Sequence, residues 1–272
     1  MSLLNDQYEV DTRLYDGARF EVLRARRRED DLPVILKLLK ETQPSPEHIA
    51  RLRREAETMR SVESPYVIRY HGFETDQRRW VLVQEDFGGV PIAAMIREPQ
   101  HELGAKLEVA ISLVRGIDDL HSKSVIHKDI NPTNVLWNVD SGELKIIDFG
   151  ISTVLSQENP DFFNANWLEG TLAYISPEQT GRTNAPVDYR TDYYSLGVTL
   201  YELFSGERPF TSTDPLELVY AHIAKRPVPP PGEVPGGAGP AGRGDHEAAR
   251  EVAQGPLPER LRHPLRSPAL PG

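Results

Sequence analysis

Three polar residues, Asp129, Asn134 and Asp148, have the types and the spacing that phosphoryl transfer from a metal-bound nucleotide requires. Two short segments between Asn134 and Asp148 have the composition of strands, and an Asp-Ser-Gly turn joins them. Such a hairpin returns Asp148 to the neighbourhood of Asn134. The sequence therefore predicts two oxygen ligands for Mg²⁺ beside a carboxylate that can accept a hydroxyl proton.

The composition limits the other chemistries open to the chain. Its 272 residues and 39% hydrophobic content suffice for one large or two small lobes. The lack of cysteine excludes disulfides, thiolate zinc sites and thiol catalysis, and the eight histidines form no HExxH pair. A net charge of −10 argues against nonspecific nucleic-acid binding, which depends on basic residues that neutralise phosphates.

No part of the sequence predicts membrane insertion or secretion. The apolar runs stay well below the roughly 18 residues of a membrane-spanning helix. The N-terminal segment has neither the basic region nor the apolar region of a signal peptide. We therefore expect a cytoplasmic protein.

The first third of the chain, residues 8–85, alternates short runs of β-forming residues with one helical segment. The helix is predicted to begin at Ser45 and Pro46, an N-cap residue followed by proline at the first helical position. Its predicted buried stripe consists of Ile49, Leu52, Ala56 and Met59. The predicted strands span 8–14, 19–25, 33–39, 66–73 and 79–85. This pattern favours a small sheet with one helix.

From about residue 104 the pattern becomes helical. Segment 193–204 is apolar nearly all round, as expected of a central buried helix. Asp214 with Pro215 begins another predicted helix, which must end before Pro227. A further predicted helix carries apolar residues at helical spacing at Leu107, Ile111, Val114 and Ile117.

The segment 127–150 resembles the catalytic loop, the hairpin and the Asp-Phe-Gly metal motif of eukaryotic-type protein kinases. Residues 170–178 (GTLAYISPE) look like the end of a kinase activation segment, and residues 192–197 (DYYSLG) like the start of the helix that anchors the catalytic loop. Small-molecule phosphotransferases share the first motif but normally lack the second. The resemblance covers about residues 8–226. The sequence of this region is similar to that of the kinase-like domains of large bacterial signalling proteins, which continue into an ATPase and a sensor histidine kinase.

The resemblance implies an α+β, two-lobed protein kinase-like fold and an ATP- and Mg²⁺-dependent protein serine/threonine kinase of bacterial signal transduction. A small β-rich N-lobe would span about residues 8–85, and a helical C-lobe lacking its last helices would span about residues 91–226. The Gly170-Thr171 pair favours serine/threonine specificity. The implied partners are ATP and a protein substrate, or fused or partner signalling domains.

The resemblance also implies roles for individual residues. Asp129 would orient the substrate hydroxyl and accept its proton, while Asn134 and Asp148 would hold Mg²⁺. Lys37 would position the phosphates and pair with Glu55, whose place on the apolar stripe of its helix turns the carboxylate inward. The remaining nucleotide contacts would come from Gly17, Val22, the gatekeeper Gln84 and the hinge residues Glu85 to Phe87.

Three departures from the family pattern favour an alternative, in which the chain is a pseudokinase or a nucleotide-binding regulatory module. Only Gly17 remains of the three glycines that let backbone amides approach the phosphates. Asn131 stands in place of the catalytic-loop lysine; its amide can form hydrogen bonds in the site but cannot neutralise developing charge. Lys128 stands in place of an arginine that would clamp a phosphorylated activation segment.

Residues 227–272 are rich in proline and glycine and contain no aromatic residue, so we expect them to be disordered. We also expect the chain after about Pro231 to be read in a shifted frame, because codons for residues 245–252 can encode Ile-Met-Lys-Leu-Leu-Ala-Lys in another frame. Kinases of this type normally continue into further helices, with an arginine that pairs with the equivalent of Glu178. Without them, Glu178 would lack its buried partner and the central helix would expose apolar surface.

Overall fold

The computed structural model of the chain describes residues 6–41, 44–76, 79–98, 101–154 and 172–227. The described residues all belong to one compact unit within residues 1–230, and residues 231–272 lie wholly outside the described part of the chain. The predicted tail of residues 227–272, with its predicted disorder and shifted frame, falls outside them except for its first residue. Thr171 also lies outside the described residues.

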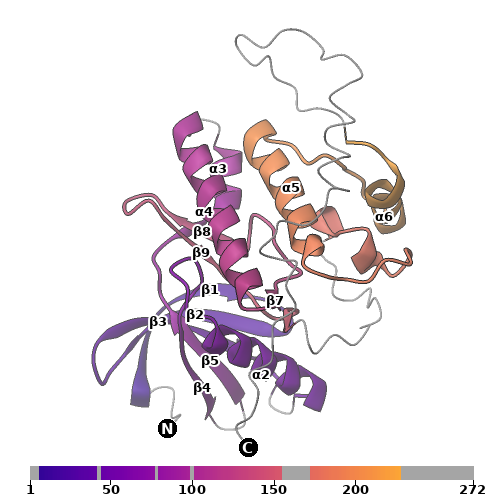
Figure 1. Ribbon diagram of the computed structural model, residues 1–272. Coiled ribbons are helices and arrows are strands. Elements are labelled where there is room, and N and C mark those ends of the chain that lie inside the picture. The colour runs from indigo at the N-terminus through magenta and orange to yellow at the C-terminus, as the bar shows by residue number, and fades with distance from the viewer. Residues whose placement is uncertain (1–5, 42–43, 77–78, 99–100, 155–171, 228–272) are drawn as a thin grey trace, which may run out of the picture. The chain divides into compact units, whose positions relative to one another are not determined.

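Five antiparallel strands form the sheet of the N-terminal part, in the order β1-β2-β3-β5-β4 (Figure 1). Their bounds are β1 Tyr8–Asp16, β2 Phe20–Arg27, β3 Leu32–Leu39, β4 Tyr70–Asp76 and β5 Arg79–Glu85. All five predicted strands are confirmed, but β4 begins later than predicted. Residues 66–68 instead pair with Ile146, whose N–H donates to the carbonyl of Tyr66 at 2.7 Å.

One helix, α2 (Pro46–Ser61), packs against this sheet (Figure 1). Ser45 caps the helix as predicted, because its hydroxyl accepts a hydrogen bond from the N–H of His48 at 3.2 Å. The predicted stripe faces the core, with Ile49 partly buried and Leu52, Ala56 and Met59 buried. The same helix face carries Glu55, which is therefore directed toward the sheet.

The rest of the described chain is mainly helical (Figure 1). Its helices are α3 (Ile92–Arg97), α4 (Leu103–Ser122), α5 (Arg190–Ser205), α6 (Pro215–Ala224) and the 3₁₀ turns η3 (Leu172–Tyr174) and η4 (Glu178–Thr180). Its short strands are β6 (Val90–Pro91), β7 (Val125–Ile126), β8 (Val135–Asn138), β9 (Glu143–Ile146) and β10 (Thr153–Val154). Among the described residues, no helix combines the length and the apolar character needed to cross a membrane.

Two local predictions for this part are confirmed. The predicted hairpin is β8–β9, and Gly142 in its turn has a φ of +68°, a conformation that favours glycine. The helix predicted from Asp214 is α6, which Asp214 caps by accepting from the N–H of Leu216 at 2.8 Å. This helix ends at Ala224, before Pro227 as predicted.

A hydrophobic cluster joins the sheet to the helices. It contains Leu82 of β5, Leu52 of α2, Leu113 and Ile117 of α4, and Phe149 after the hairpin, all fully buried. Because these elements share one core, the sheet, α2 and the hairpin are held close together. The described residues thus have the expected α+β organisation, a β-rich part followed by a helical part.

Helix α4 has apolar residues on an exposed face as well as on its buried face. Leu107, Ile111 and Val114 are 46%, 52% and 47% exposed, whereas Ile117 is buried. The buried face includes Val109, Leu113, Ile117 and Leu120. The helix has apolar residues on two faces, so helical spacing alone could not tell which face meets the core.

The apolar sequence of α5 predicted a central helix that is buried on nearly all sides. The structure shows that part of this helix is exposed. Tyr193 and Phe204 are 44% and 39% exposed. The expected lack of a partner for Glu178 is only partly correct, because the hydroxyl of Thr191 donates to its Oε1 at 2.7 Å. One oxygen of the Glu178 carboxylate, which was expected to pair with an arginine, is therefore bonded by a neutral hydroxyl.

Candidate active site

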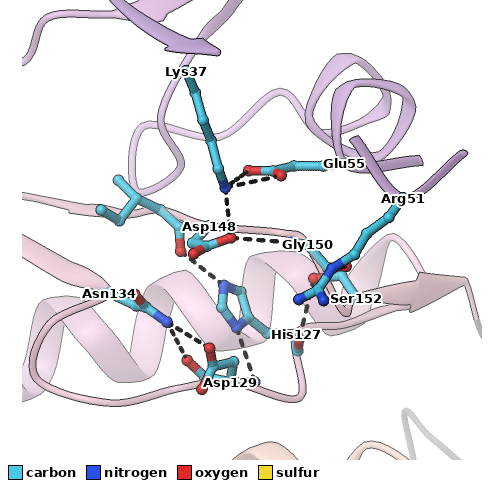
Figure 2. Close-up of polar contacts among 10 residues, drawn as sticks. Lys37, Arg51, Glu55, His127, Asp129, Asn134, Asp148, Gly150 and Ser152 are labelled. Carbon is cyan, nitrogen blue, oxygen red and sulfur yellow. Dashed lines mark hydrogen bonds and ion pairs between the residues drawn. The ribbon is translucent and has the colours of Figure 1, made fainter. Parts of the chain in front are cut away.

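The ammonium group of Lys37 lies at the centre of the candidate site, between two carboxylates (Figure 2). Lys37 is on β3, and its neighbours across the sheet are Val22 on β2 and Leu82 on β5. Its Nζ lies 2.8 Å and 3.0 Å from the carboxylate oxygens of Glu55, and 3.0 Å from Oδ1 of Asp148. The structure therefore brings together residues predicted from three separate segments of the sequence.

The charges of this cluster determine its protonation. Burial by itself would lower the pKa of Lys37, but the negative charges of Asp148 and Glu55 outweigh it and raise this pKa above its ordinary value. Partial burial would raise the pKa of Asp148, but the charge of Lys37 and hydrogen bonds from Lys37 and the Gly150 N–H lower it to about 2. At neutral pH the ammonium group and the Asp148 carboxylate are therefore both charged.

The carboxylate of Asp129 is held by two side-chain amides. Nδ2 of Asn131 donates to Oδ1 of Asp129 at 2.9 Å, and Nδ2 of Asn134 donates to Oδ2 at 2.9 Å (Figure 2 shows the second contact). Thr133 orients the Asn131 amide, because its hydroxyl and its N–H donate to Asn131 Oδ1 at 2.6 Å and 2.9 Å. The sequence did not point to Thr133, although an asparagine side chain that accepts from the N–H two residues later is a known local hydrogen-bonding pattern.

The imidazole of His127 joins this loop to the hairpin. Its Nε2 lies 3.1 Å from the carbonyl oxygen of Ile147, and its Nδ1 lies 3.2 Å from the N–H of Asp129. Burial lowers the pKa of His127, which favours the neutral ring. A neutral ring that donates from Nε2 and accepts at Nδ1 satisfies both neighbours. The ring also packs edge-on against Phe149, with centroids 4.8 Å apart.

A buried carboxylate supports the backbone before Asp129. Asp192, near the start of α5, is fully buried and accepts from the N–H groups of His127 at 2.9 Å and Lys128 at 2.7 Å. It also lies 2.8 Å from Nε2 of His121 on α4. Lys128 has a φ of 69°, a left-handed conformation that costs a non-glycine residue roughly 1 kcal/mol or more. The Asp192 carboxylate helps to hold this conformation.

The predicted nucleotide loop connects β1 to β2 at Gly17. The N–H of Gly17 donates to the carbonyl of Phe20 at 3.0 Å, and its own carbonyl accepts from Nζ of Lys40 at 3.0 Å. Lys40 also pairs with Asp16 at 2.6 Å. A side chain at position 17 would meet the ring of Tyr15, which is exposed and would have to move to make room. Lys40 thus stabilises a loop that contains only one of the three glycines of the family pattern.

The predicted gatekeeper and hinge residues lie at the end of β5 and in the connection to β6. The strand register places Gln84 on the same sheet face as Lys37. The carboxylate of Glu85 lies 3.5 Å from Nζ of Lys145, and this Nζ also lies 5.7 Å from the ring centroid of Phe87. Phe87 packs against the shared core.

Comparisons with known proteins agree with this geometry. The family described as protein kinase domain matches residues 8–230. The chain is 30% identical to "Probable serine/threonine-protein kinase CPE1738" of Clostridium perfringens over 232 residues, which are 84% of this chain and 33% of that protein. It is 29% identical to serine/threonine-protein kinase pkn3 of Myxococcus xanthus over 82% of this chain and 42% of that protein.

A further relative is serine/threonine-protein kinase PknB of Mycobacterium tuberculosis. It is 30% identical over 235 residues, which are 84% of this chain and 37% of that protein. The chain thus spans between 33% and 42% of the length of these three relatives.

We predict that Lys37→Met lowers the free energy of unfolding by about 3 kcal/mol, because it leaves Glu55 buried without its cation. The matched control is Lys40→Met, which removes an ion pair with Asp16 at the surface and should cost at most about 1 kcal/mol. Urea denaturation of both variants measures the two losses. Equal losses would contradict the importance given to the buried cluster.

Proposed function

Because the chain belongs to the protein kinase family, we propose that it transfers the γ-phosphate of ATP to serine or threonine hydroxyls of a protein in bacterial signal transduction. The main support is the presence, in one site, of an assembled cluster of Lys37, Glu55 and Asp148 and an oriented Asp129 carboxylate. Kinases of this family use ATP with Mg²⁺.

Asn134 and Asp148 offer the oxygen ligands that Mg²⁺ prefers. Asn134 directs its Nδ2 toward Asp129, so its amide oxygen points away from Asp129. Asp148 uses Oδ1 for Lys37 and for the N–H of Gly150, and its side chain is 43% exposed. An amide oxygen and a carboxylate oxygen fit the ion. When bound, Mg²⁺ would supply charge neutralisation at the phosphates.

Asp129 is the proposed acceptor of the substrate proton. Both of its carboxylate oxygens accept an amide hydrogen bond, which fixes the direction of the group, and a carboxylate can accept the proton of a substrate hydroxyl. Lys37 is the proposed contact of the α- and β-phosphates, because Glu55 holds its ammonium group in one position. Positioning of this kind supplies most of the rate in phosphoryl transfer.

We also assign the remaining nucleotide contacts to the sheet face around Lys37 and to the connection after β5. Among the described residues, Oε1 of Gln84 is buried and has no hydrogen-bond partner. It can therefore accept a hydrogen bond from the amino group of adenine. Further proposed contacts are Gly17, Val22, Glu85 and Phe87.

An inert module or a purely regulatory nucleotide-binding module has less support. Asn131 lacks the charge of a lysine, but its amide is oriented by Thr133 and directed at Asp129. The nucleotide loop has lost glycines, but Lys40 holds its backbone through the carbonyl of Gly17. Both departures therefore come with contacts that preserve the geometry of the site.

The proposed substrate is a cytoplasmic protein. The curated relatives are named serine/threonine-protein kinases, which favours a protein substrate over a small molecule. Since these relatives are longer than the matched region, we propose that fused or partner signalling domains supply the regulating signal.

We predict that the protein transfers radiolabelled γ-phosphate to casein or to itself, and that Asp129→Asn lowers the rate by about 100-fold or more because the proton acceptor is lost. The matched control is Asp140→Asn in the exposed hairpin turn, which should keep the wild-type rate. The proposal fails if the wild type transfers no more label than Asp129→Asn while both bind ATP.

We predict that Asn131→Lys raises the transfer rate, because it adds a cation beside the γ-phosphate while a donor to Asp129 remains. Asn131→Ala should lower the rate, since it leaves Oδ1 of Asp129 without this amide donor. An unchanged rate in Asn131→Lys, with ATP binding intact, would show that a charge at this position is not needed.

A further inference from the structure

The two peptide groups that flank Lys128 are bonded by side chains from two different elements. The N–H of Lys128 donates to Oδ1 of Asp192 at 2.7 Å, and its carbonyl accepts from Nε2 of Gln179 at 2.8 Å. Lys128 is in a left-handed conformation with a φ of 69° and directly precedes Asp129. A rotation of either peptide group would therefore change the direction of the Asp129 carboxylate.

The amide of Gln179 has only one orientation that satisfies its neighbours. Its Oε1 accepts from the N–H and from the hydroxyl of Ser176, each at 3.1 Å. A backbone N–H can only donate, so Oε1 must face Ser176 and Nε2 must face the carbonyl of Lys128. Ser176 is fully buried, so a flipped amide would leave a buried donor and an acceptor unpaired.

The segment that carries Gln179 is itself attached to α5. The hydroxyl of Thr191 donates to Glu178, as described above, and the hydroxyl of Ser195 donates to the carbonyl of Tyr174 at 2.8 Å. Gln179 therefore extends from residues 172–180, which α5 supports, and reaches the catalytic loop. Asp192 supports the same loop from α5 itself.

We infer that Gln179 is a positioning residue for Asp129, through which residues 172–180 control the geometry of the catalytic loop. This inference rests on the proposed function. If the segment moves, Nε2 of Gln179 withdraws from the carbonyl of Lys128, and one of the two bonds that hold the strained residue is lost. The position of this segment is thereby coupled to phosphate transfer. The segment could be recognised in the sequence, but this contact could not.

The test uses Gln179→Glu, which places an acceptor against the carbonyl of Lys128, and Gln179→Met, which removes the donor at similar volume. We expect kcat to fall by about tenfold or more in both variants, because small displacements of catalytic groups have large effects. KM for ATP should stay unchanged, since Lys37 and Glu55 are not touched. The matched control is Tyr174→Phe, which removes a hydrogen bond from the same segment to Glu202 on α5 and should keep the wild-type kcat.

Hydrogen exchange gives a second readout that does not need activity. In Gln179→Glu, amides of residues 127–131 should exchange faster than in the wild type, while Tyr174→Phe leaves them unchanged. Wild-type kcat and exchange in Gln179→Glu would overturn the inference, as would equal losses in Tyr174→Phe. If the wild type transfers no phosphate, the proposed function fails, and the exchange result alone decides whether Gln179 holds the loop.

Discussion

A buried ammonium group between two carboxylates is the interaction on which the rest of the site depends. Lys37 comes from the sheet, Glu55 from α2 and Asp148 from the end of the hairpin, so the cluster can form only when all three elements pack together. A second contact joins two of these elements, α2 and the end of the hairpin, because Nε of Arg51 on α2 donates to the carbonyl of Gly150 at 2.9 Å (Figure 2). The charged groups that hold these elements together are also of the kind that a nucleotide phosphate and its metal ion require.

Two non-glycine residues in the site have left-handed backbone conformations. Lys128 has a φ of 69° and Asp148 has a φ of 64°. Such conformations persist only where the surroundings hold them, and they are concentrated at functional sites. Here Asp192 and Gln179 hold the first, while Lys37 and the N–H of Gly150 hold the carboxylate of the second. The side chains that fix the backbone conformation of the catalytic loop thus come from residues that are distant from it in the sequence.

The parts of the site that could be predicted are those set by local sequence. The hairpin followed from its turn residues, and Gly142 takes the conformation that such a turn needs. The pair of Lys37 and Glu55 followed from helix phase, because Glu55 lies on the face that Leu52 and Met59 bury. The helical periodicity alone was therefore sufficient to predict that the carboxylate of Glu55 points toward the sheet.

The parts that could not be predicted depend on contacts between distant segments. Helix α4 has apolar residues on two faces, and only the packed core shows that Leu107 and Ile111 are exposed. Residues 66–68 have a strand-like composition but pair with the hairpin instead of extending β4. The partner of Gln179 lies 51 positions earlier in the chain, and no local pattern connects them. The hydrogen-bonding ability of Asn131 could be predicted from its residue type, but its partner Asp129 is seen only in the structure.

We propose that the Lys37 cluster and Asn134 form a site for ATP with Mg²⁺. The most direct measurement is the melting temperature of the protein with ATP and Mg²⁺, with ATP and EDTA, and without ligand. Since a ligand that binds the native state stabilises it by mass action, the account predicts a higher Tm with ATP, and a further rise with Mg²⁺ that Asp148→Ala removes. No shift at millimolar ATP and Mg²⁺, or the same shift with and without Mg²⁺, would contradict it.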